Sequence, residues 1–409
     1  MQERKTQVLW LLAFCMALMM TGMNIIWPIF ARRFSAFGSG EQALGVMATV
    51  YALANIAASP LMGTLADRWG RRPVVLLALG AFIASNVGFV LARSVVVFII
   101  IRVFEGFFTA GLGPAAMGLV SDVAPADRRA RWVGVVAGGT SVGWVIGPLI
   151  GGVLYDLGGY AAPFVASAGM AAITFAAAFV VIPETHTAAR ESQFASGDGL
   201  ARWQRLWAVL PRPLDTLAVL FVLSFLMVFC WAFIEPHLMF YVFDDLGWST
   251  AQFGVAVAGY GSALVVGELA LGQLSDHWGR KPVLVVGLVL HTAQYVGLIT
   301  TQSWGLLLIF KALGGLGDGL VTPALTASYL DITPEEHKGR ILGIKGAVAA
   351  VGGVLGPGLM VLTSGFFTPR GSFALSGVLL LGGALLAATA LRSAPDRPAA
   401  AAFPAATGP

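Results

Sequence analysis

Six ionisable residues stand inside long apolar runs of the chain, where charged side chains are rare. They are Arg102, Glu105, Glu235, Glu268, Lys311 and Asp318. At the centre of a lipid bilayer an ionised side chain costs at least ~2.5–3.5 kcal/mol on insertion scales unless it is paired or hydrated. Because acids and bases at such positions commonly relay protons, we interpret the six as a proton-coupling set that faces a wet cavity and not lipid.

Spacing along the chain indicates how members of this set interact. Arg102 and Glu105 are three residues apart on one helical face and can form an ion pair. Lys311 and Asp318 are seven residues apart, so they share a helical face without obligatory contact. Burial favours the protonated form of a carboxyl group and a nearby ammonium favours the ionised form, so Asp318 is positioned to load and release a proton. Glu268 lies near the end of its apolar run, where a gate or loop-anchoring role is as consistent as proton transfer.

The place of other residues in the runs suggests contact with a cavity or with water. Glu235 precedes Pro236, which frees a backbone carbonyl and lets a helix bend, as in helices that line transporter cavities. Lys345 lies about one turn from the end of its run, so its long side chain can reach water. Seven polar or aromatic residues can supply stacking and hydrogen bonds to a substrate: Asn24, Trp27, Tyr51, Asn55, Trp144, Trp231 and Tyr260.

The apolar runs indicate a membrane protein that crosses the bilayer many times. Hydrophobic residues make up 57% of the 409 positions and charged residues only 11%, against about 25% in a soluble domain. Lipid offers no partner for free backbone groups, so runs long enough to cross the ~30 Å hydrocarbon core must be helical. We predict twelve spans at residues 8–30, 43–66, 74–92, 95–121, 133–156, 162–182, 214–241, 251–275, 283–301, 304–330, 340–364 and 372–392.

The distribution of basic residues predicts the orientation of these spans. Of the 25 Lys and Arg residues, eighteen fall on the side of the N-terminus, four on the opposite side and three within spans. The positive-inside rule therefore places both termini in the cytoplasm. The same dispersal over short loops beside apolar runs argues against a nucleic-acid partner.

A charged decapeptide occurs twice, as GTLADRWGRR at residues 63–72 and as GQLSDHWGRK at residues 272–281. The same offset of 209 residues relates Arg102 to Lys311, and it covers an even number of spans. The halves are therefore parallel repeats, with a substrate site between them. We expect an all-α membrane fold with an N-terminal six-helix bundle at residues 1–182, a cytoplasmic linker at 183–213, a C-terminal six-helix bundle at 214–392 and a disordered tail at 393–409.

Each decapeptide predicts a short hairpin with charge pairs at one mouth of the protein. Gly70 permits a positive φ, and Pro73 suits the first turn of the next helix. Asp67 and Arg71 can pair if the backbone between them is helical, and Asp122 offers a second acidic partner. We assign a cytoplasmic gate to Gly63, Asp67, Arg68, Gly70, Arg71, Arg72, Asp122, Gly272, Asp276, Gly279, Arg280, Lys281 and Asp331.

Glycines repeat every four residues in the fifth span. This pattern makes a stripe of small residues on which another helix can approach closely. In the second half two of the equivalent positions hold Val348 and Met360, so the stripe is complete only once. The motif comprises Gly139, Gly143, Gly147, Pro148, Gly151 and Gly152.

These motifs together resemble those of the major facilitator superfamily. The decapeptide is similar to the cytoplasmic loop signature of that family, and RVFEGFFTAG from Arg102 resembles its fourth-span motif, although Glu105 replaces a residue that is usually uncharged. GTSVGWVIGPLIGG at residues 139–152 resembles the fifth-span motif of its twelve-span drug:proton antiporters, such as the multidrug and tetracycline exporters. The resemblance implies two bundles that rock about a central site, with Asp67, Arg71 and Asp122 latching the outward-facing state.

We therefore expect a secondary transporter that exports small amphipathic or cationic compounds in exchange for protons. Export of a sugar, amino acid or lipid-linked metabolite is the alternative, because the motifs determine the machinery and not the substrate. In-membrane acids favour a cation, whereas Arg102 and Lys311 could serve an anion. A sensor or scaffold that transports nothing is a third possibility, and it should tolerate neutralisation of Glu235 and Asp318.

Other functional classes are disfavoured by what the sequence lacks. It has no G-x-x-x-x-G-K-[ST] loop for ATP and no nucleophile–base pair in a water-exposed segment, so we expect a non-enzyme. We expect no cofactor and no metal, and the partners to be a small-molecule substrate, protons and membrane lipid, with a monomeric chain. Twenty Arg against five Lys suggest a high-GC bacterium and hence its inner membrane.

Overall fold

The computed structural model describes residues 2–125, 128–182, 213–271 and 274–391. Within these ranges the chain is helical and contains no strand, and twelve helices are long and apolar enough to cross a membrane. The expected all-α fold with twelve spans is confirmed. Most of the expected linker at 183–213, the tail at 393–409 and Gly272 lie outside the described residues.

The spans of the first half are built from eight helices. They are α1 (Gln2–Ile26), α2 (Ile29–Ala36), α3 (Glu41–Trp69), α4 (Arg71–Leu91), α5 (Val95–Thr109), α6 (Leu112–Val123), α7 (Arg129–Gly158) and α8 (Ala161–Val181). The short α2 and α6 complete the first and fourth spans.

The second half repeats this order. Its elements are α10 (Leu214–Phe240), the π-helical η3 (Tyr241–Asp245), α11 (Thr250–Val266), the π-helical η4 (Gly267–Leu271), α12 (Leu274–His277), α13 (Arg280–Thr300), α14 (Trp304–Asp331), the 3₁₀ turn η5 (Glu335–His337), α15 (Lys338–Thr363) and α16 (Pro369–Ala390).

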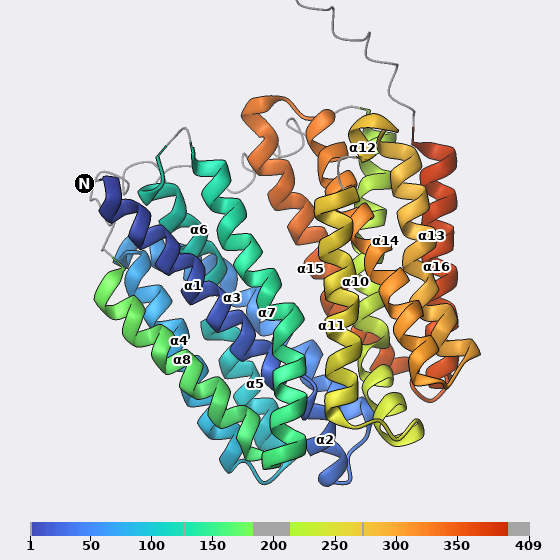
Figure 1. Ribbon diagram of the computed structural model, residues 1–409, viewed down its shortest axis with the longest axis horizontal. Coiled ribbons are helices and arrows are strands. Elements are labelled where there is room, and N and C mark those ends of the chain that lie inside the picture. The colour runs from blue at the N-terminus through green and yellow to red at the C-terminus, as the bar shows by residue number, and fades with distance from the viewer. Residues whose placement is uncertain (1, 126–127, 183–212, 272–273, 392–409) are drawn as a thin grey trace, which may run out of the picture.

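Equivalent helices pack together in the two halves. In the first half α1 packs on α7, α4 on α8 and α3 on α5, and in the second half α10 packs on α15, α13 on α16 and α11 on α14. The halves meet through α7 against α11 and α3 against α15. Figure 1 shows the two groups of helices converging near α2 and spreading apart toward the end that holds the N-terminus and α12.

Polar contacts between the halves hold the converging end. An Arg32 Nη2 donates to the Trp248 carbonyl oxygen at 2.5 Å, and its guanidinium carbon lies 4.1 Å from the centre of the Phe243 ring. Asp156, near the end of α7, accepts hydrogen bonds from the backbone N–H groups of Thr250 and Ala251 at 3.3 and 2.9 Å. These N–H groups belong to the first turn of α11. Backbone N–H groups in the first turn of a helix have no acceptor within that helix. A carboxylate there also interacts favourably with the helix dipole.

A second pair of contacts lies at the same end. His237 Nδ1 lies 2.8 Å from Glu41 Oε2, and Gln42 Nε2 donates to Ser364 Oγ at 2.8 Å. Among the described residues no comparable polar contact joins the halves at the end that carries the decapeptides. The protein is therefore closed at the α2 end.

Candidate functional site

A cavity of about 480 Å³ lies between the halves and is walled mainly by the second half. Helices α10, α11, α13, α14 and α15 supply most of its surface, and α7 and Trp27, in the turn after α1, supply the remainder. Most of the wall is apolar, with a few polar groups that converge on one side, as in many small-molecule sites. The polar wall contains Ser224, Tyr260, His291, Lys311, Asp318, Thr322 and Lys345.

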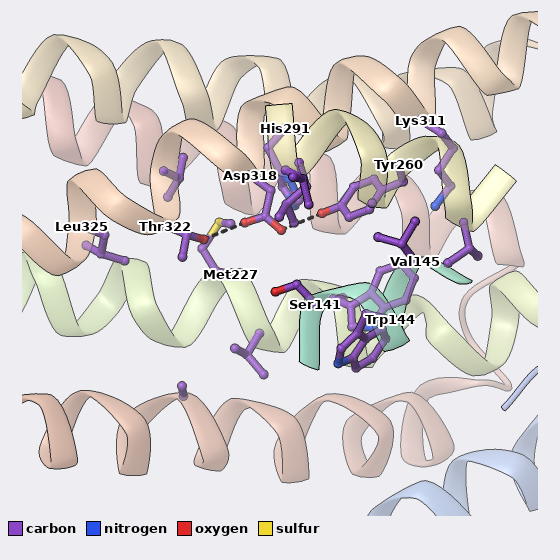
Figure 2. A pocket seen from close by; sticks show the side chains of 18 of the residues that line it. Ser141, Trp144, Val145, Met227, Tyr260, His291, Lys311, Asp318, Thr322 and Leu325 are labelled. Atoms are coloured by element: carbon purple, nitrogen blue, oxygen red, sulfur yellow. Dashed lines mark hydrogen bonds between the residues drawn. The ribbon is translucent and has the colours of Figure 1, made fainter. Parts of the chain in front are cut away.

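Asp318 is the carboxylate on this wall, and each of its two oxygens accepts a hydrogen bond from a hydroxyl group. Tyr260 Oη donates to Asp318 Oδ2 at 2.7 Å, and Thr322 Oγ1 donates to Oδ1 at 3.1 Å. Figure 2 shows Asp318 between these two side chains, with Trp144 on the facing wall. An aspartate held by two hydroxyl donors at the edge of a cavity can bind and release a proton while its side chain stays in position.

A chain of hydrogen bonds runs through α13 and α14 to Lys311. His291 Nδ1 lies 3.2 Å from the Gly314 carbonyl oxygen, which can only accept, so this nitrogen carries the proton. In the neutral ring Nε2 is then an acceptor, and it lies 3.2 Å from Gln294 Nε2. The carbonyl oxygen of the same amide, Gln294 Oε1, accepts from Lys311 Nζ at 3.1 Å.

Three tryptophans gather toward the closed end of the cavity. The Trp27 ring lies 6.1 Å from that of Trp144 and 5.9 Å from that of Trp231, measured between ring centroids. Trp27 Nε1 donates to Glu235 Oε1 at 2.5 Å, so an indole of the first half binds a carboxylate of the second. This hydrogen bond links the two halves beside the cavity.

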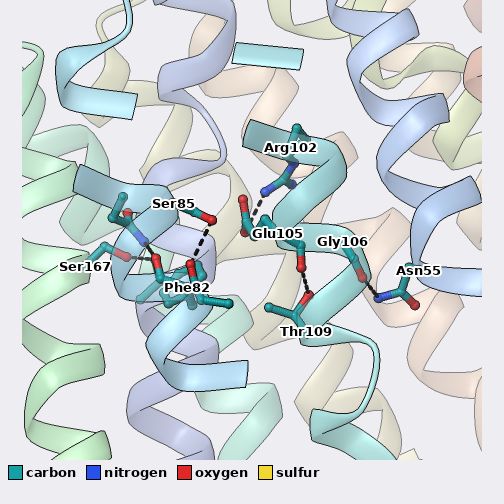
Figure 3. A network of polar contacts seen from close by, with 11 residues as sticks. Asn55, Phe82, Ser85, Arg102, Glu105, Gly106, Thr109 and Ser167 are labelled. Carbon is teal, nitrogen blue, oxygen red and sulfur yellow. Dashed lines mark hydrogen bonds and ion pairs between the residues drawn. The ribbon is translucent and has the colours of Figure 1, made fainter. Parts of the chain in front are cut away.

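Arg102 and Glu105 form a separate buried pair within the first half. Arg102 Nη1 lies 2.8 Å from Glu105 Oε1, and the Glu105 side chain is fully buried. The guanidinium carbon also lies 4.0 Å from the centre of the Tyr51 ring. Figure 3 shows this pair beside the hydrogen bond from Asn55 to the Gly106 carbonyl oxygen. The ion pair that the spacing predicts is therefore present, away from the cavity wall.

The structure brings together part of the residue set that the sequence suggested for substrate binding. Trp27, Trp144, Trp231 and Tyr260 line the cavity, whereas Asn24, Tyr51 and Asn55 do not. Asn24 is buried where α1 meets α7, and its side chain donates to the Met20 carbonyl oxygen at 2.8 Å. Tyr51 and Asn55 instead support α5, through the Arg102 contact and the Gly106 carbonyl.

The in-membrane charges divide in a similar way. Asp318 and Lys311 face the cavity, Glu235 binds Trp27 next to it, and Glu268 lies on η4 outside the cavity lining. Lys345 also lines the cavity, and its Nζ donates a hydrogen bond to Thr326 Oγ1 on α14 at 2.6 Å.

Several polar residues of the site were not anticipated. Thr322 follows Asp318 by four residues, and Gln294 follows His291 by three, so both pairs share a helical face and the spacing was a usable signal. Ser141 and Ser224 carry no such signal, because single serines are common in membrane helices.

The decapeptides form the expected hairpins. Gly70 and Gly279 have φ values of 99° and 87°, a region that favours glycine, and each immediately precedes the helix that begins at Arg71 or Arg280. Both prolines of the repeat, Pro73 among them, fall in the first turn of that helix.

Charge pairing differs between the two copies. Arg280 pairs with Asp276 at 2.6 Å and with Asp331 at 2.9 Å, whereas Arg71 pairs with Asp122 at 3.1 Å. Asp67 is exposed and forms no ion pair with the described residues, so the pairing of Asp67 with Arg71 is not present in this conformation. Each pair stays within its own half.

The remaining members of the decapeptides lie on the surface or in the helices beside it. Arg72 donates to the Phe179 carbonyl oxygen, and Gly63 has open space where a Cβ would stand. Arg68 is exposed, and Lys281 is partly exposed at the start of α13.

The glycine stripe of α7 packs closely on α1. A Cβ placed on Gly143 would lie 2.5 Å from the Thr21 backbone nitrogen, and one on Gly151 would lie 2.0 Å from the Ile25 carbonyl oxygen. Gly139 and Gly147 face α1 in the same way, whereas Gly152 faces the Thr250 carbonyl oxygen of the other half. The stripe therefore allows the close helix approach that its spacing predicts.

We expect Gly70→Ala to destabilise the hairpin by about 1–3 kcal/mol, because an alanine at this φ and ψ is strained whatever space surrounds it. Thermal unfolding of the purified protein measures the effect. Gly63→Ala in the same decapeptide is the matched control, since it adds a methyl group to open space within α3. Equal melting temperatures for the two variants would contradict the role assigned to Gly70.

Comparison with known proteins agrees with this architecture. The family model of the Major Facilitator Superfamily matches residues 10–250 and 220–408. The chain belongs to the Major Facilitator Superfamily. It is therefore a membrane transporter and not an enzyme, as the sequence predicted.

Individual members of the superfamily resemble the chain at modest identity. The class G tetracycline resistance protein of Vibrio anguillarum is 26% identical over 343 residues, which cover 82% of this chain and 85% of that protein. The multi-drug resistance efflux pump PmrA of Streptococcus pneumoniae is 27% identical and covers 81% of this chain and 82% of its own. A bacterial homologue of the human lysosomal transporter Spinster, solved in an inward-facing and unoccupied conformation, has a TM-score of 0.74 at 16% identity and covers 95% of this chain and 97% of its own.

Proposed function

We propose that this member of the superfamily exports small amphipathic compounds in exchange for protons. The observation that carries the proposal is the cavity between two halves that touch at one end, with an aspartate on its polar wall and Trp27 and Trp144 supplied by the first half. Such a cavity binds a ring-containing substrate and a proton at neighbouring places. The relatives named above, which confer tetracycline resistance or act as multidrug efflux pumps, support export of drug-like compounds.

We place both termini and the decapeptides in the cytoplasm of a bacterial cell with the chain in the inner membrane, on the charge distribution of the loops. The cavity then belongs to an inward-open conformation, and the contacts of Arg32, Asp156 and His237 close the outer side. We take residues 1–182 and 214–392 as the two bundles that move against each other, in a monomer surrounded by lipid.

The charge pairs of the decapeptides have a defined part in this cycle. In the inward-open conformation Arg71 and Arg280 keep their pairs within their own halves, and Asp67 is left unpaired among the described residues. Closure of the cytoplasmic side would bring these groups toward the other half. The partly exposed pairs of Arg280 contribute only about 0–1 kcal/mol each, so such pairs can bias closure without blocking reopening.

Proton coupling is assigned first to Asp318 and then to Glu235. Asp318 shares the cavity with the substrate, so a change in its protonation changes the charge of the wall that the substrate contacts. Glu235 of the second half accepts a hydrogen bond from Trp27 of the first half. The charge of Glu235 therefore affects the strength of this contact between the halves. The proposed set is completed by charges that contribute to the electrostatic field around these carboxyl groups. They are Arg102 with Glu105, Lys311 and Glu268.

Transport by the purified protein in liposomes with an imposed pH gradient tests the function. The compounds are ethidium, tetracycline and glucose, and the internal pH is followed with a trapped dye. We expect the gradient to drive accumulation of the drugs and not of the sugar, with matching proton movement.

Accumulation of glucose alone would support the alternative of metabolite export. Absence of any gradient-driven movement, by protein that binds these compounds, would support the sensor. A variant with the cavity filled, Ser141→Trp, is the matched control for passive leak, because Ser141 lines the cavity and carries no charge.

A further inference from the structure

Lys311 presents a buried ammonium group to the cavity without a carboxylate partner among the described residues. Its side chain lines the cavity and the residue is only 8% exposed, yet the acceptor within reach of Nζ is the neutral Gln294 amide. Arg102, the equivalent residue of the first half, is neutralised by Glu105. The second half therefore keeps a positive charge that the first half has cancelled.

The hydrogen-bond chain behind Lys311 fixes the ammonium as a donor. The Gly314 carbonyl fixes the proton on His291 Nδ1, so the other ring nitrogen, Nε2, is an acceptor and determines how the Gln294 amide is turned. Gln294 then directs its oxygen, and not its NH₂ group, at Lys311. A lysine ammonium has three N–H donors, so one is held by Gln294 and the others are left for a ligand.

The carboxylate on the same wall does not compensate this charge. Asp318 lies on the same helix as Lys311, but its two oxygens accept from Tyr260 and Thr322, and no ion pair joins it to the lysine. Lys345 is a second cavity lysine, and its described partner is the Thr326 hydroxyl. With Asp318 ionised, the lysines leave the polar wall with a net positive charge.

Aromatic rings lie next to the Lys311 ammonium. Nζ is 5.2 Å from the centre of the Trp231 ring and 5.9 Å from that of Tyr260. Trp231 in turn contacts Trp27, whose ring also faces Trp144. An acidic group bonded to Nζ would therefore hold an attached ring system against the tryptophans.

We propose that the cavity selects amphipathic aromatic compounds that carry an acidic group, such as a carboxylate, sulfonate or enolate. The acidic group binds Lys311, and the ring packs on Trp231. Lys311 is the specificity-determining residue, and Gln294 and His291 position it. This inference rests on the proposed function, because it names the substrate class of the same cavity.

Equilibrium binding of matched dansyl probes to the full chain in nanodiscs tests the charge preference. Dansylglycine carries a carboxylate, dansylamide is neutral and dansylcadaverine carries an ammonium. We expect dansylglycine to bind roughly tenfold more tightly than dansylamide, and Lys311→Gln to weaken dansylglycine binding roughly tenfold more than it weakens dansylamide binding.

Two further variants separate charge from a structural role. Lys311→Arg keeps the positive charge and should retain most of the preference. Gln294→Glu keeps Lys311 but places a carboxylate at the position of its amide oxygen, so it should weaken dansylglycine binding roughly as much as Lys311→Gln does. Lys338→Gln is the control, because Lys338 pairs with Glu335 outside the cavity.

Tighter binding of dansylcadaverine than of dansylglycine, or an unchanged preference in both Lys311→Gln and Gln294→Glu, would overturn the inference. Proton-driven transport of the three probes in liposomes separates this failure from failure of the proposed function. If the gradient moves dansylcadaverine but not dansylglycine, the protein is an exporter as proposed, and the preference for acidic substrates is refuted. A gradient that moves none of them, together with Lys311-dependent binding of dansylglycine, refutes the exporter and supports the charge preference.

Discussion

Asp318→Asn should abolish proton-driven accumulation of substrate, with a fall of roughly 100-fold or more in the concentration ratio that the pH gradient sustains. Asparagine keeps an oxygen that can accept from Tyr260 or Thr322, so the polar wall should keep its shape. It has no carboxyl group to bind a proton, so substrate movement is no longer tied to proton movement. Transport down a substrate gradient should survive, because binding and rocking do not require the proton.

Measurement of both modes in the same liposomes separates loss of coupling from loss of folding. Asp245→Asn is the matched control, since Asp245 is an exposed carboxylate on η3, away from the cavity. Glu235→Gln belongs in the same assay, because glutamine can still accept from Trp27 but carries no charge. If Asp318→Asn and Glu235→Gln both accumulate substrate as the parent does, neither carboxyl group carries the coupling proton.

The sequence predicted the fold well because the strongest patterns in it are those that a lipid bilayer imposes on a spanning chain. Apolar run length, the lack of backbone partners in hydrocarbon and the 209-residue repeat each act on the whole chain and do not depend on side-chain detail. The hairpin glycine at position 70 was predictable for a similar reason, since a charged turn between two spans needs a residue that accepts a positive φ.

The site was less predictable, because the sequence of a membrane helix does not show whether a given face contacts lipid, another helix or a cavity. Asn24 lies near the end of α1 and Trp27 directly follows that helix, yet Asn24 packs on α7 and Trp27 reaches the cavity. Apolar residues face lipid, protein and cavity alike, so periodicity separates these environments poorly. Gln294 shares a helical face with His291, but its contact with Lys311 depends on how α13 packs against α14, which spacing along one helix does not show.

The incomplete second glycine stripe has a structural reason that spacing did not reveal. Met360 stands where Gly151 stands in the first half, and it is fully buried. A Cβ on Gly45 of α3 would lie 2.5 Å from its terminal methyl group, so Met360 fills the contact between α3 and α15. The two halves therefore use equivalent positions differently, for packing within a bundle in one and between bundles in the other.

Gly151→Ala should reduce the thermal stability of the protein more than any other single methyl addition to the stripe. The new Cβ would lie 2.0 Å from the Ile25 carbonyl oxygen, which is backbone and cannot turn aside. The helices α1 and α7 must separate, and overpacking of this kind costs about 1–3 kcal/mol or more. We expect a fall of roughly 1–4 °C in the melting temperature measured by intrinsic fluorescence, with less monodisperse protein on size exclusion.

Gly138→Ala is the matched control on the same helix. Position 138 is exposed and has no neighbouring atom within 4 Å of an added Cβ, so the only change is the higher helix propensity of alanine. Its melting temperature should equal or slightly exceed that of the parent. Gly143→Ala should fall between the two variants, because its clash distance of 2.5 Å from the Thr21 nitrogen is longer than that at position 151. If Gly151→Ala is as stable as Gly138→Ala, the close contact of α1 and α7 does not determine the stability of the first half.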